Sequence, residues 1–332
     1  MAPPGAGTGP AVGLDVGGTK TLAALLGPHG EVLAQTRLTT ELGREGVVAS
    51  AAAAVRGVAQ QAGVAVGDLV GVGVGVPGLV EPEAGTVRHA VNLGLDGDPT
   101  PLAALLSGTL GGVPVAVEND LNVAALGAAH LADDDRPVDL AFLALGTGLA
   151  AGLVIDGRLR RGEGGAAGEI GHVPVDPAGL LCPCGQRGCL ELYASGSAVS
   201  RLWPSRTGRP APLELFEAAA AGDPAARVAR RRYASAVAAA VRMLALAVDV
   251  RHVVLGGGVA QLGDPLLDAV REALADEART SRFIESLHLP ERVRLAPGRV
   301  PVAAVGAAVV GQQAAAARAL AFSAERTNPN GA

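Results

Sequence analysis

The stretch Ala11 to Leu26, AVGLDVGGTKTLAALL, decides how this chain begins to fold. It contains two apolar runs, Ala11 to Val16 and Thr21 to Leu26, with only Gly17-Gly18-Thr19-Lys20 between them. So short a connection leaves no room for the crossover helix that parallel strands require. We therefore predict an antiparallel hairpin with a glycine turn, and a third strand over 32–38.

The same pattern occurs again further along the chain. Leu140 to Leu145 and Leu149 to Ile155 are apolar runs joined by Gly146-Thr147-Gly148. After each hairpin, strand and helix patterns alternate, and an internal repeat of this kind indicates two similar α/β lobes, which we expect to face a cleft. The later elements that we expect are helices over about 45–61, 122–130, 234–248 and 265–278, and strands over 69–76, 113–117 and 252–255.

The two glycine turns have the chemistry of a phosphate site. Gly17-Gly18-Thr19 exposes backbone N–H groups and a hydroxyl with no bulky side chain in the way, and Gly146-Thr147-Gly148 repeats this device. Asp15 is suited to holding a hydrated Mg²⁺ ion, and Lys20 is the only lysine of the chain. Either turn alone could be an ordinary hairpin, but two could grip one nucleotide from opposite lobes. Neither is a Rossmann or Walker motif, because a strand follows each turn where those motifs require a helix.

Asn119-Asp120 closes an apolar strand, a place where catalytic side chains are firmly held. A carboxylate here could accept the proton of a substrate hydroxyl as its oxygen attacks a γ-phosphoryl group. Alternatively, Asp120 is the N-cap of the helix that follows, and the two roles are compatible.

All three cysteines of the chain lie between Cys182 and Cys189, shortly after His172. Three thiolates and an imidazole satisfy tetrahedral zinc, and glycines at 185 and 188 allow a short loop to turn its sulfurs inward. The alternative is chance packing of small apolar thiols, and a disulfide would leave one thiol over. We expect a structural Zn²⁺ ion held by His172, Cys182, Cys184 and Cys189.

Five further polar positions are associated with turns, strand ends and the cysteine loop. Together they offer the donors and acceptors that read sugar hydroxyls, although each alone could be an ordinary surface residue. The set consists of Asn92, Asn119, Glu169, His172 and Glu191.

The composition limits the class of protein. The 332 residues are 49% hydrophobic and 18% charged, which is typical of a globular enzyme or receptor with room for two packed lobes. A net charge of −5 gives no electrostatic footprint for nucleic acid, and Arg242 and Asp249 interrupt the apolar stretch 234–250, so we expect no membrane span. Residues 1–10 have no signal-peptide features, so we expect a disordered leader on a cytoplasmic protein.

From about residue 11 to about residue 315, these motifs resemble those of the ROK sugar kinases, the bacterial glucokinase-like branch of the actin/hexokinase superfamily. Asp15–Lys20 is similar to the family's first phosphate motif, Glu118–Asp120 to its catalytic motif and Leu145–Gly148 to its second phosphate motif. Gly168–His172 with the cysteine loop is similar to the family's zinc signature, and Leu255–Val259 to its adenosine segment.

The resemblance implies two actin-like (ribonuclease H-like) lobes flanking a central cleft. The small lobe would span 11–124, completed by a helix near 303–322, the large lobe would span 125–302, and 323–332 would be a loose tail. Asp120 would be the general base, the five polar residues and Asp120 would bind a hexose, and the second ring nitrogen of His172 would face a sugar hydroxyl. The residues expected to bind ATP with Mg²⁺ are Asp15, Gly17, Gly18, Thr19, Lys20, Gly146, Thr147, Gly148, Gly256, Gly257 and Gly258.

The expected activity is ATP-dependent phosphorylation of a hexose at its 6-hydroxyl, most simply glucose, by a homodimer or homotetramer. Another hexose (N-acetylglucosamine, N-acetylmannosamine, mannose or fructose) is the alternative, and polyphosphate is an alternative donor. A further alternative is that the protein is a sugar-sensing regulator. ROK regulators carry DNA-binding helices before the first phosphate motif, and we expect the few residues before Ala11 to leave no room for them. A catalytically retired sugar-binding protein is disfavoured by Asp120 and both phosphate turns.

Two positions depart from the family pattern. Leu95 stands where the family's glucokinases commonly have Trp, which should remove an aromatic wall from the sugar pocket. Ala150-Ala151 replace glycines after the second phosphate motif and should add methyl groups close to the phosphates. We expect both changes to affect sugar choice and turnover more than reaction type.

Overall fold

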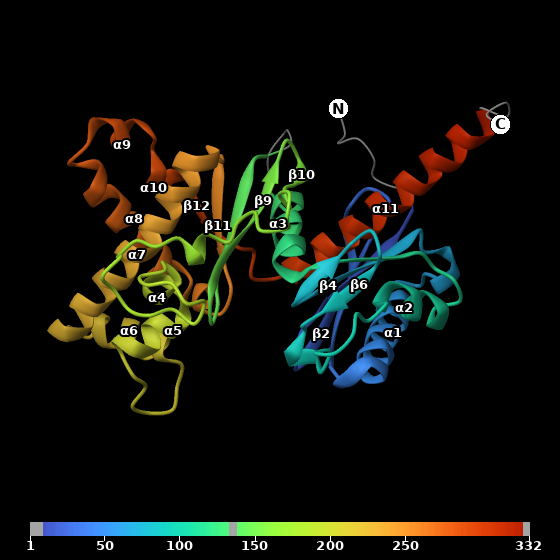
Figure 1. Ribbon diagram of the computed structural model, residues 1–332, viewed down its shortest axis with the longest axis horizontal. Coiled ribbons are helices and arrows are strands. Elements are labelled where there is room, and N and C mark those ends of the chain that lie inside the picture. Colours follow the sequence, from blue (N-terminus) through green and yellow to red (C-terminus); the bar gives the residue numbers. More distant parts are fainter. Residues whose placement is uncertain (1–8, 133–137, 328–332) are drawn as a thin grey trace. The chain divides into compact units, whose positions relative to one another are not determined.

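The computed structural model describes residues 9–132 and 138–327. The chain divides into two units, one built from Met1–Pro137 with Pro297–Ala332 and the other from Val138–Ala296 (Figure 1). The division falls later than residue 124 because helix α3 (Asp120–His130) packs along helix α11 (Val302–Thr327) in the first unit. Since α11 continues through Thr327, the expected loose tail is helical in its first part. Residues 1–8 and 328–332 of the expected leader and tail lie outside the described residues.

The first unit contains a five-stranded sheet in the order β3-β2-β1-β4-β7. The hairpin predicted around the first glycine turn is confirmed, with Val16 paired to Thr21. The pairs β1-β2 and β2-β3 are antiparallel, whereas β1-β4 and β4-β7 are parallel. The strands are β1 (Ala11–Val16), β2 (Lys20–Leu26), β3 (Val32–Thr39), β4 (Gly71–Val76) and β7 (Val115–Asn119).

Helices cover both faces of this sheet. Val12, Leu14 and Val16 of β1 pack in one apolar cluster with α1 (Gly43–Gln61), and α2 (Leu102–Thr109) joins the same cluster. Because side chains alternate along a strand, the odd-numbered residues of β1 point to the face that α11 covers. Short elements that the sequence did not predict are η1 (Val66–Asp68), β5 (Leu79–Glu81), β6 (Thr86–Arg88) and η2 (Val91–Leu93).

Helix α11 lies directly on β1 and β4 because both strands present glycine to it. A Cβ on Gly13 would lie 1.9 Å from the carbonyl oxygen of Ala304, and a Cβ on Gly73 would lie 1.7 Å from that of Ala307. Any side chain at these positions would push the helix away from the sheet. The face that carries Asp15 is therefore held close to a helix backbone.

The second unit repeats the plan of the first. Its sheet has the order β10-β9-β8-β11-β12, with antiparallel pairs in β10-β9 and β9-β8 and parallel pairs in β8-β11 and β11-β12. Order and directions match those of the first sheet, so the internal repeat predicted from the sequence is confirmed. The strands are β8 (Leu140–Leu145), β9 (Leu149–Ile155), β10 (Arg158–Leu159), β11 (His252–Gly256) and β12 (Val293–Leu295).

The helices of the second unit pack around one apolar cluster that includes residues of α6, α7 and α8. Helix α7 begins ten residues before the predicted start at Ala234, because Asp223 caps it and Pro224 occupies its first turn. The helices are η3 (Ile170–His172), α4 (Glu191–Ala194), α5 (Gly196–Leu202), α6 (Ala211–Ala220), α7 (Pro224–Val248), η4 (Val259–Leu262), α8 (Asp264–Ala278), α9 (Arg282–Ser286) and α10 (Leu289–Arg292).

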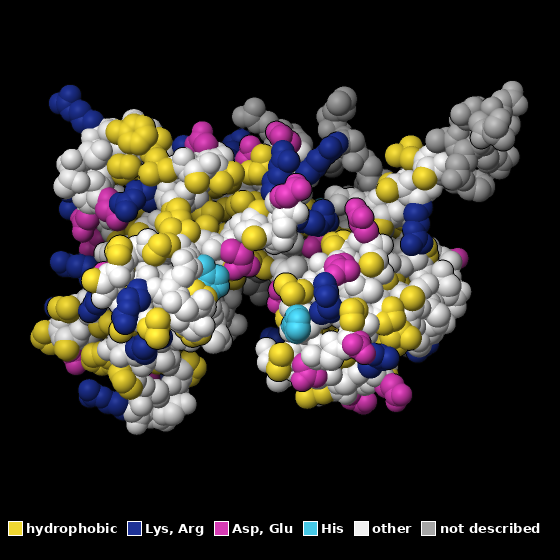
Figure 2. Space-filling view, viewed as in Figure 1, with side chains coloured by type: hydrophobic (Ala, Val, Ile, Leu, Met, Phe, Trp, Pro, Cys, Tyr) yellow, Lys and Arg dark blue, Asp and Glu magenta, His cyan; other side chains and the backbone are white. Residues whose placement is uncertain are grey.

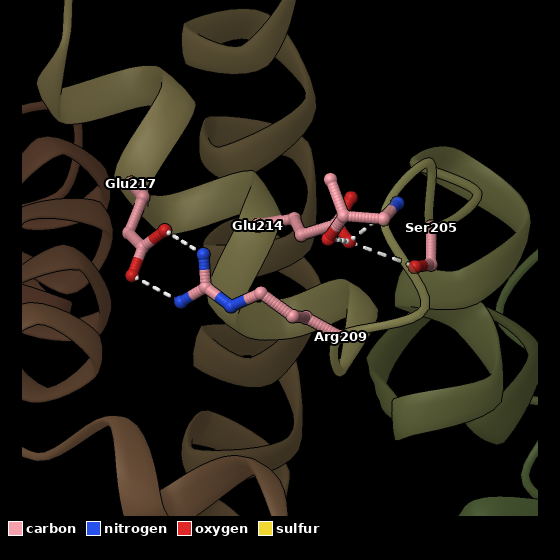
Figure 3. A network of polar contacts seen from close by, with 5 residues as sticks. Ser205, Arg209, Glu214 and Glu217 are labelled. Carbon is pink, nitrogen blue, oxygen red and sulfur yellow. Dashed lines mark hydrogen bonds and ion pairs between the residues drawn. The ribbon is translucent and has the colours of Figure 1, made fainter.

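The loop between α5 and α6 begins after Leu202 and ends where α6 begins at Ala211. The Glu214 carboxylate holds it by accepting hydrogen bonds from Ser205 Oγ at 2.8 Å and Thr207 Oγ1 at 2.6 Å (Figure 3). These donors, led by the Thr207 hydroxyl, lower the pKa of Glu214 to about 2. Arg209 and Glu217 add a bidentate ion pair beside them. The loop is thus fixed by side-chain hydrogen bonds in place of backbone structure.

The described surface mixes charges of both signs. Figure 2 shows Lys and Arg side chains interspersed with Asp and Glu over the face in view. Among the described helices, none combines the length and the apolar character needed to cross a membrane.

Candidate functional site

The first glycine turn lies beside Asn92. Its backbone is closed by the Gly17 N–H, which donates to the Lys20 carbonyl oxygen at 3.0 Å. A Cβ on Gly18 would lie 2.4 Å from the Asn92 carbonyl oxygen, so only glycine lets the two segments approach this closely. The structure therefore brings one predicted sugar-binding residue against a predicted phosphate-binding turn within the first unit.

Asp15 and Asp120 form a pair of interacting carboxyl groups. Burial and the negative charge of Asp120 raise the pKa of Asp15 to about 6, and the positive charge of Lys20 offsets this only in part. Burial also raises the pKa of Asp120, while a hydrogen bond from the Leu121 N–H opposes that rise. Asp15 and Asp120 lie near the carboxyl ends of β1 and β7, which flank β4, and acids with raised pKa values are typical of catalytic and metal-binding sites.

Asn119, not Asp120, is the N-cap of helix α3. Its Oδ1 accepts hydrogen bonds from the backbone N–H groups of Leu121 at 3.0 Å and Asn122 at 3.3 Å. Asp120 occupies the first helical position, where its Oδ1 also accepts a hydrogen bond from the Leu121 N–H at 2.8 Å. The Asn119 Nδ2 group donates to the Gly78 carbonyl oxygen at 3.5 Å, which leaves the amide strongly oriented.

Glu118 is a buried residue of this site to which the sequence assigned no role. Its side chain is only 1% exposed, and its Oε1 accepts hydrogen bonds from the Asn119 N–H at 3.0 Å and from Asn122 Nδ2 at 2.8 Å. These bonds fix the first turn of α3, on which Asn119 and Asp120 lie. The sequence feature that could have indicated this role is a charged residue at the end of an otherwise apolar strand.

The second glycine turn meets two other segments of the second unit. The Gly196 N–H donates to the Gly146 carbonyl oxygen at 2.7 Å. Gly257 has a φ of +84°, and a Cβ there would lie 2.7 Å from the carbonyl oxygen of Leu145. Because β8 and β11 are parallel, their carboxyl ends meet at one edge, where ligands of α/β sheets commonly bind. The predicted adenosine segment 256–258 thus lies beside the predicted phosphate turn.

The expected effect of Ala151 on the phosphates is wrong. Its side chain is 2% exposed and belongs to the apolar core of the second unit. Successive side chains of a strand point to opposite faces, so only Ala150 can project its methyl group on the other side of β9. Leu95 is 5% exposed and packs in the core of the first unit.

The four predicted metal ligands come together. One ligand atom from each of His172, Cys182, Cys184 and Cys189 lies within 4.8 Å of all the others. The Cys184 and Cys189 sulfurs are 3.6 Å apart, close to the edge of about 3.7 Å that tetrahedral Zn–S bonds produce. His172 Nδ1 is buried with no hydrogen-bond partner among the described residues. The donor set and this unpartnered nitrogen fit a zinc ion.

The thiols of this cluster differ in acidity. Hydrogen bonds from the backbone and side chain of Gln186 lower the pKa of Cys184 to about 6, whereas burial raises the pKa of Cys189 to about 12. Gln186 Nε2 also donates to the His172 carbonyl oxygen at 3.2 Å. Because its lowered pKa makes Cys184 a thiolate more easily, Cys184 is suited to binding a metal ion at neutral pH.

The predicted sugar residues of the second unit surround this cluster. Glu169 is exposed and directly precedes η3, which carries His172. A Cβ on Gly171 would lie 2.0 Å from the Leu149 carbonyl oxygen, so η3 packs tightly on β9. Glu191 opens α4, lies beside Cys182 Sγ and accepts a hydrogen bond from the Leu149 N–H. Glu169, His172 and Glu191 therefore belong to one region of the second unit.

Two units with the same sheet order, each opened by a glycine-turned hairpin, define the actin-like class of ATPase fold. The chain belongs to the ROK family, whose family model matches residues 11–313. It is 34% identical over 281 residues to a glucokinase of Streptomyces coelicolor, covering 79% of this chain and 86% of that protein.

Two further likenesses bear on substrate and nucleotide. A ROK family glucokinase from Streptomyces griseus, solved in complex with glucose and AMPPNP, has a TM-score of 0.71 and 33% identity, covering 92% of this chain and 100% of that one. An N-acetylmannosamine kinase of Vibrio cholerae is 32% identical over 278 residues, covering 83% of this chain and 91% of that protein.

Proposed function

We propose that this chain is an ATP-dependent hexose kinase that phosphorylates glucose at its 6-hydroxyl. The observation that carries the proposal is the interacting carboxyl pair of Asp15 and Asp120, which lies in the same unit as the first glycine turn and Asn92. The similarity to a glucokinase solved with glucose and AMPPNP supports both the sugar and the nucleotide.

In the proposed reaction, Asp120 takes the proton of the sugar 6-hydroxyl. The O6 oxygen forms a bond to the γ-phosphorus, the bond from that phosphorus to the β–γ bridging oxygen breaks, and ADP leaves. Because burial raises its pKa above the ordinary value, Asp120 is a stronger base than an exposed aspartate. Glu118 and Asn119 keep the first turn of α3 in place, so Asp120 is held where the hydroxyl must bind.

Two metal ions belong to this proposal. Asp15 would hold Mg²⁺, which neutralises charge on the phosphates, and Lys20 with the N–H groups of residues 17–19 would orient them. His172, Cys182, Cys184 and Cys189 would hold a structural Zn²⁺, which ties η3 to the cysteine loop. The second turn, 146–148, and the segment 256–258 would bind the phosphates and the adenosine of ATP.

Sugar binding is proposed for Asn92, Asn119, Asp120, Glu169, His172 and Glu191, in a cytoplasmic homodimer or homotetramer. Several directed hydrogen bonds to a gluco-configured ring discriminate strongly against an epimer that leaves one of them unpaired. The similarity to an N-acetylmannosamine kinase keeps that sugar as the second candidate. Polyphosphate is the alternative donor to ATP.

A coupled assay of ADP release tests the proposal with glucose, mannose, fructose, N-acetylglucosamine and N-acetylmannosamine. We expect the highest kcat/KM for glucose. An N-acetylated sugar preferred by more than about tenfold, roughly 1.4 kcal/mol of transition-state binding, would overturn the glucose assignment and leave the kinase assignment standing.

The role of Asp120 is tested with Asp120→Asn. Its kcat should fall at least about a hundredfold while glucose binding is retained, because only the proton acceptor is lost. Asp68→Asn, an exposed position of the same unit, is the matched control and should keep wild-type kcat. Near-normal turnover of Asp120→Asn would exclude the residue as the base.

A further inference from the structure

Glu191 touches both the cysteine cluster and the second glycine turn. Its Oε1 lies 3.6 Å from Cys182 Sγ, and its Oε2 accepts a hydrogen bond from the Leu149 N–H at 3.4 Å. A Cβ on Gly148 would lie only 2.8 Å from the same Oε2, so the carboxylate is packed against the turn itself. One side chain therefore spans from a metal ligand to the residues that close the turn.

The short segment from Cys189 to Gly196 makes a second connection between the same two places. Cys189 is a predicted metal ligand, and Glu191 begins α4 two residues later. At the other end of α4, the Gly196 N–H donates to the Gly146 carbonyl oxygen at 2.7 Å. The turn 146–148 is thus held at its last residue by Glu191 and at its first by Gly196.

We infer that Glu191 is a positioning residue for nucleotide binding, through which the metal-loaded cysteine loop fixes the second phosphate turn. The inference rests on the proposed function, since it assigns residues 146–148 to the phosphates of ATP. When the loop is ordered by its metal, α4 begins at a fixed place and the Glu191 carboxylate is pre-oriented toward the Leu149 N–H. Phosphate binding then costs less conformational entropy, because the turn is already ordered.

Coupling of this kind is reciprocal. If the metal strengthens nucleotide binding through Glu191, bound nucleotide must hold the metal more tightly by the same factor. Removing the carboxylate should abolish both effects together. A side chain that only stabilised the fold would weaken both sites without removing the dependence of one on the other.

The experiment measures the zinc dissociation constant of the loaded protein by equilibrium competition with a chelating dye, with and without AMPPNP and Mg²⁺ and with no sugar present. In the wild type, saturating AMPPNP should tighten zinc binding by about fivefold or more, the lower range of measured couplings. In Glu191→Ala, AMPPNP should change the zinc dissociation constant by less than about twofold. Glu191→Gln keeps an acceptor oxygen for the Leu149 N–H and should retain most of the effect. Glu285→Ala, exposed on α9, is the matched control and should behave as wild type.

AMPPNP binding to the same proteins, measured by titration calorimetry, separates the possible failures. If loaded wild type binds AMPPNP but holds zinc with the same dissociation constant with and without it, the inference is wrong and the proposed function stands. If Glu191→Ala keeps the full tightening of zinc binding by AMPPNP, the coupling does not pass through Glu191 and the inference is equally wrong. If loaded wild type does not bind AMPPNP, the proposed function fails and the inference fails with it.

Discussion

Asp15→Asn should make the protein more stable and inactive. In the folded chain the pKa of Asp15 is about 6, against an ordinary value of 3.8. Each pKa unit corresponds to about 1.4 kcal/mol, so keeping this carboxylate ionised costs the folded state about 3 kcal/mol at pH 7.5. Asn has nearly the same shape and carries no charge, so it removes both the burial cost and the repulsion from Asp120.

The pH dependence of this gain has a definite sign. The folded pKa is raised, so the folded state binds a proton more readily than the unfolded state, and the wild type recovers stability as the pH falls through 6 toward 4. The advantage of Asp15→Asn should therefore shrink from about 3 kcal/mol at pH 7.5 to about half of that near pH 5.

Urea unfolding followed by circular dichroism, without added Mg²⁺, measures the free energy of unfolding at pH 7.5, 6 and 5. Asp98→Asn, exposed in the same unit, is the matched control and should change stability by less than about 0.5 kcal/mol at each pH. The reasoning is refuted if Asp15→Asn is no more stable than wild type at pH 7.5, or if its advantage does not depend on pH. Retained kinase activity would separately contradict the role of Asp15 in holding Mg²⁺.

Three further predictions follow from other parts of the structure. Tyr233 Oη is fully buried with no hydrogen-bond partner among the described residues. Tyr233→Phe should therefore leave the free energy of unfolding unchanged or raise it by about 1 kcal/mol. A loss of more than about 1 kcal/mol in denaturant unfolding would contradict this prediction. A Cβ on Gly306 would lie 1.8 Å from the Val123 carbonyl oxygen where α11 crosses α3, so Gly306→Ala should lower the free energy of unfolding by about 3 kcal/mol or more. Gly57 lies in α1 with open space around it, so Gly57→Ala should raise the free energy of unfolding by up to about 1 kcal/mol. Cys184→Ala should reduce zinc to well below one equivalent by elemental analysis, and wild type that contains less than about half an equivalent while fully active would exclude the zinc site.

The glycine-turned hairpins could be predicted almost to the residue because the information is local. An apolar run, a turn that only small residues can make and a second run leave one solution, and β8 and β9 have the predicted bounds. Strands β5 and β6 have only three residues each, which is too short for an alternating pattern to be recognised. The start of α7 was missed because Arg230-Arg231-Arg232 interrupts its apolar stripe, although Asp223-Pro224 carried a capping signal.

The site residues were predictable as types but not as contacts. Chemistry alone indicated the ligands of the zinc cluster, since few other arrangements suit three thiols and a histidine. The burial of Leu95 depends on tertiary packing that a single sequence does not reveal. The contact of Glu191 with Leu149 joins residues that are 42 positions apart, and only the packing of α4 and η3 against β9 brings them together.

The split of the first unit into two sequence segments determines the order in which the chain can fold as it is synthesised. Residues 138–296 are contiguous and can fold as soon as they leave the ribosome, whereas the first unit lacks α11 until residues 302–327 have been synthesised. Until then, the glycine-lined face of β1 and β4 has no helix to cover it. The unit that is made first is therefore completed last, and a chain that stops before Val302 lacks the helix that covers one face of its first sheet.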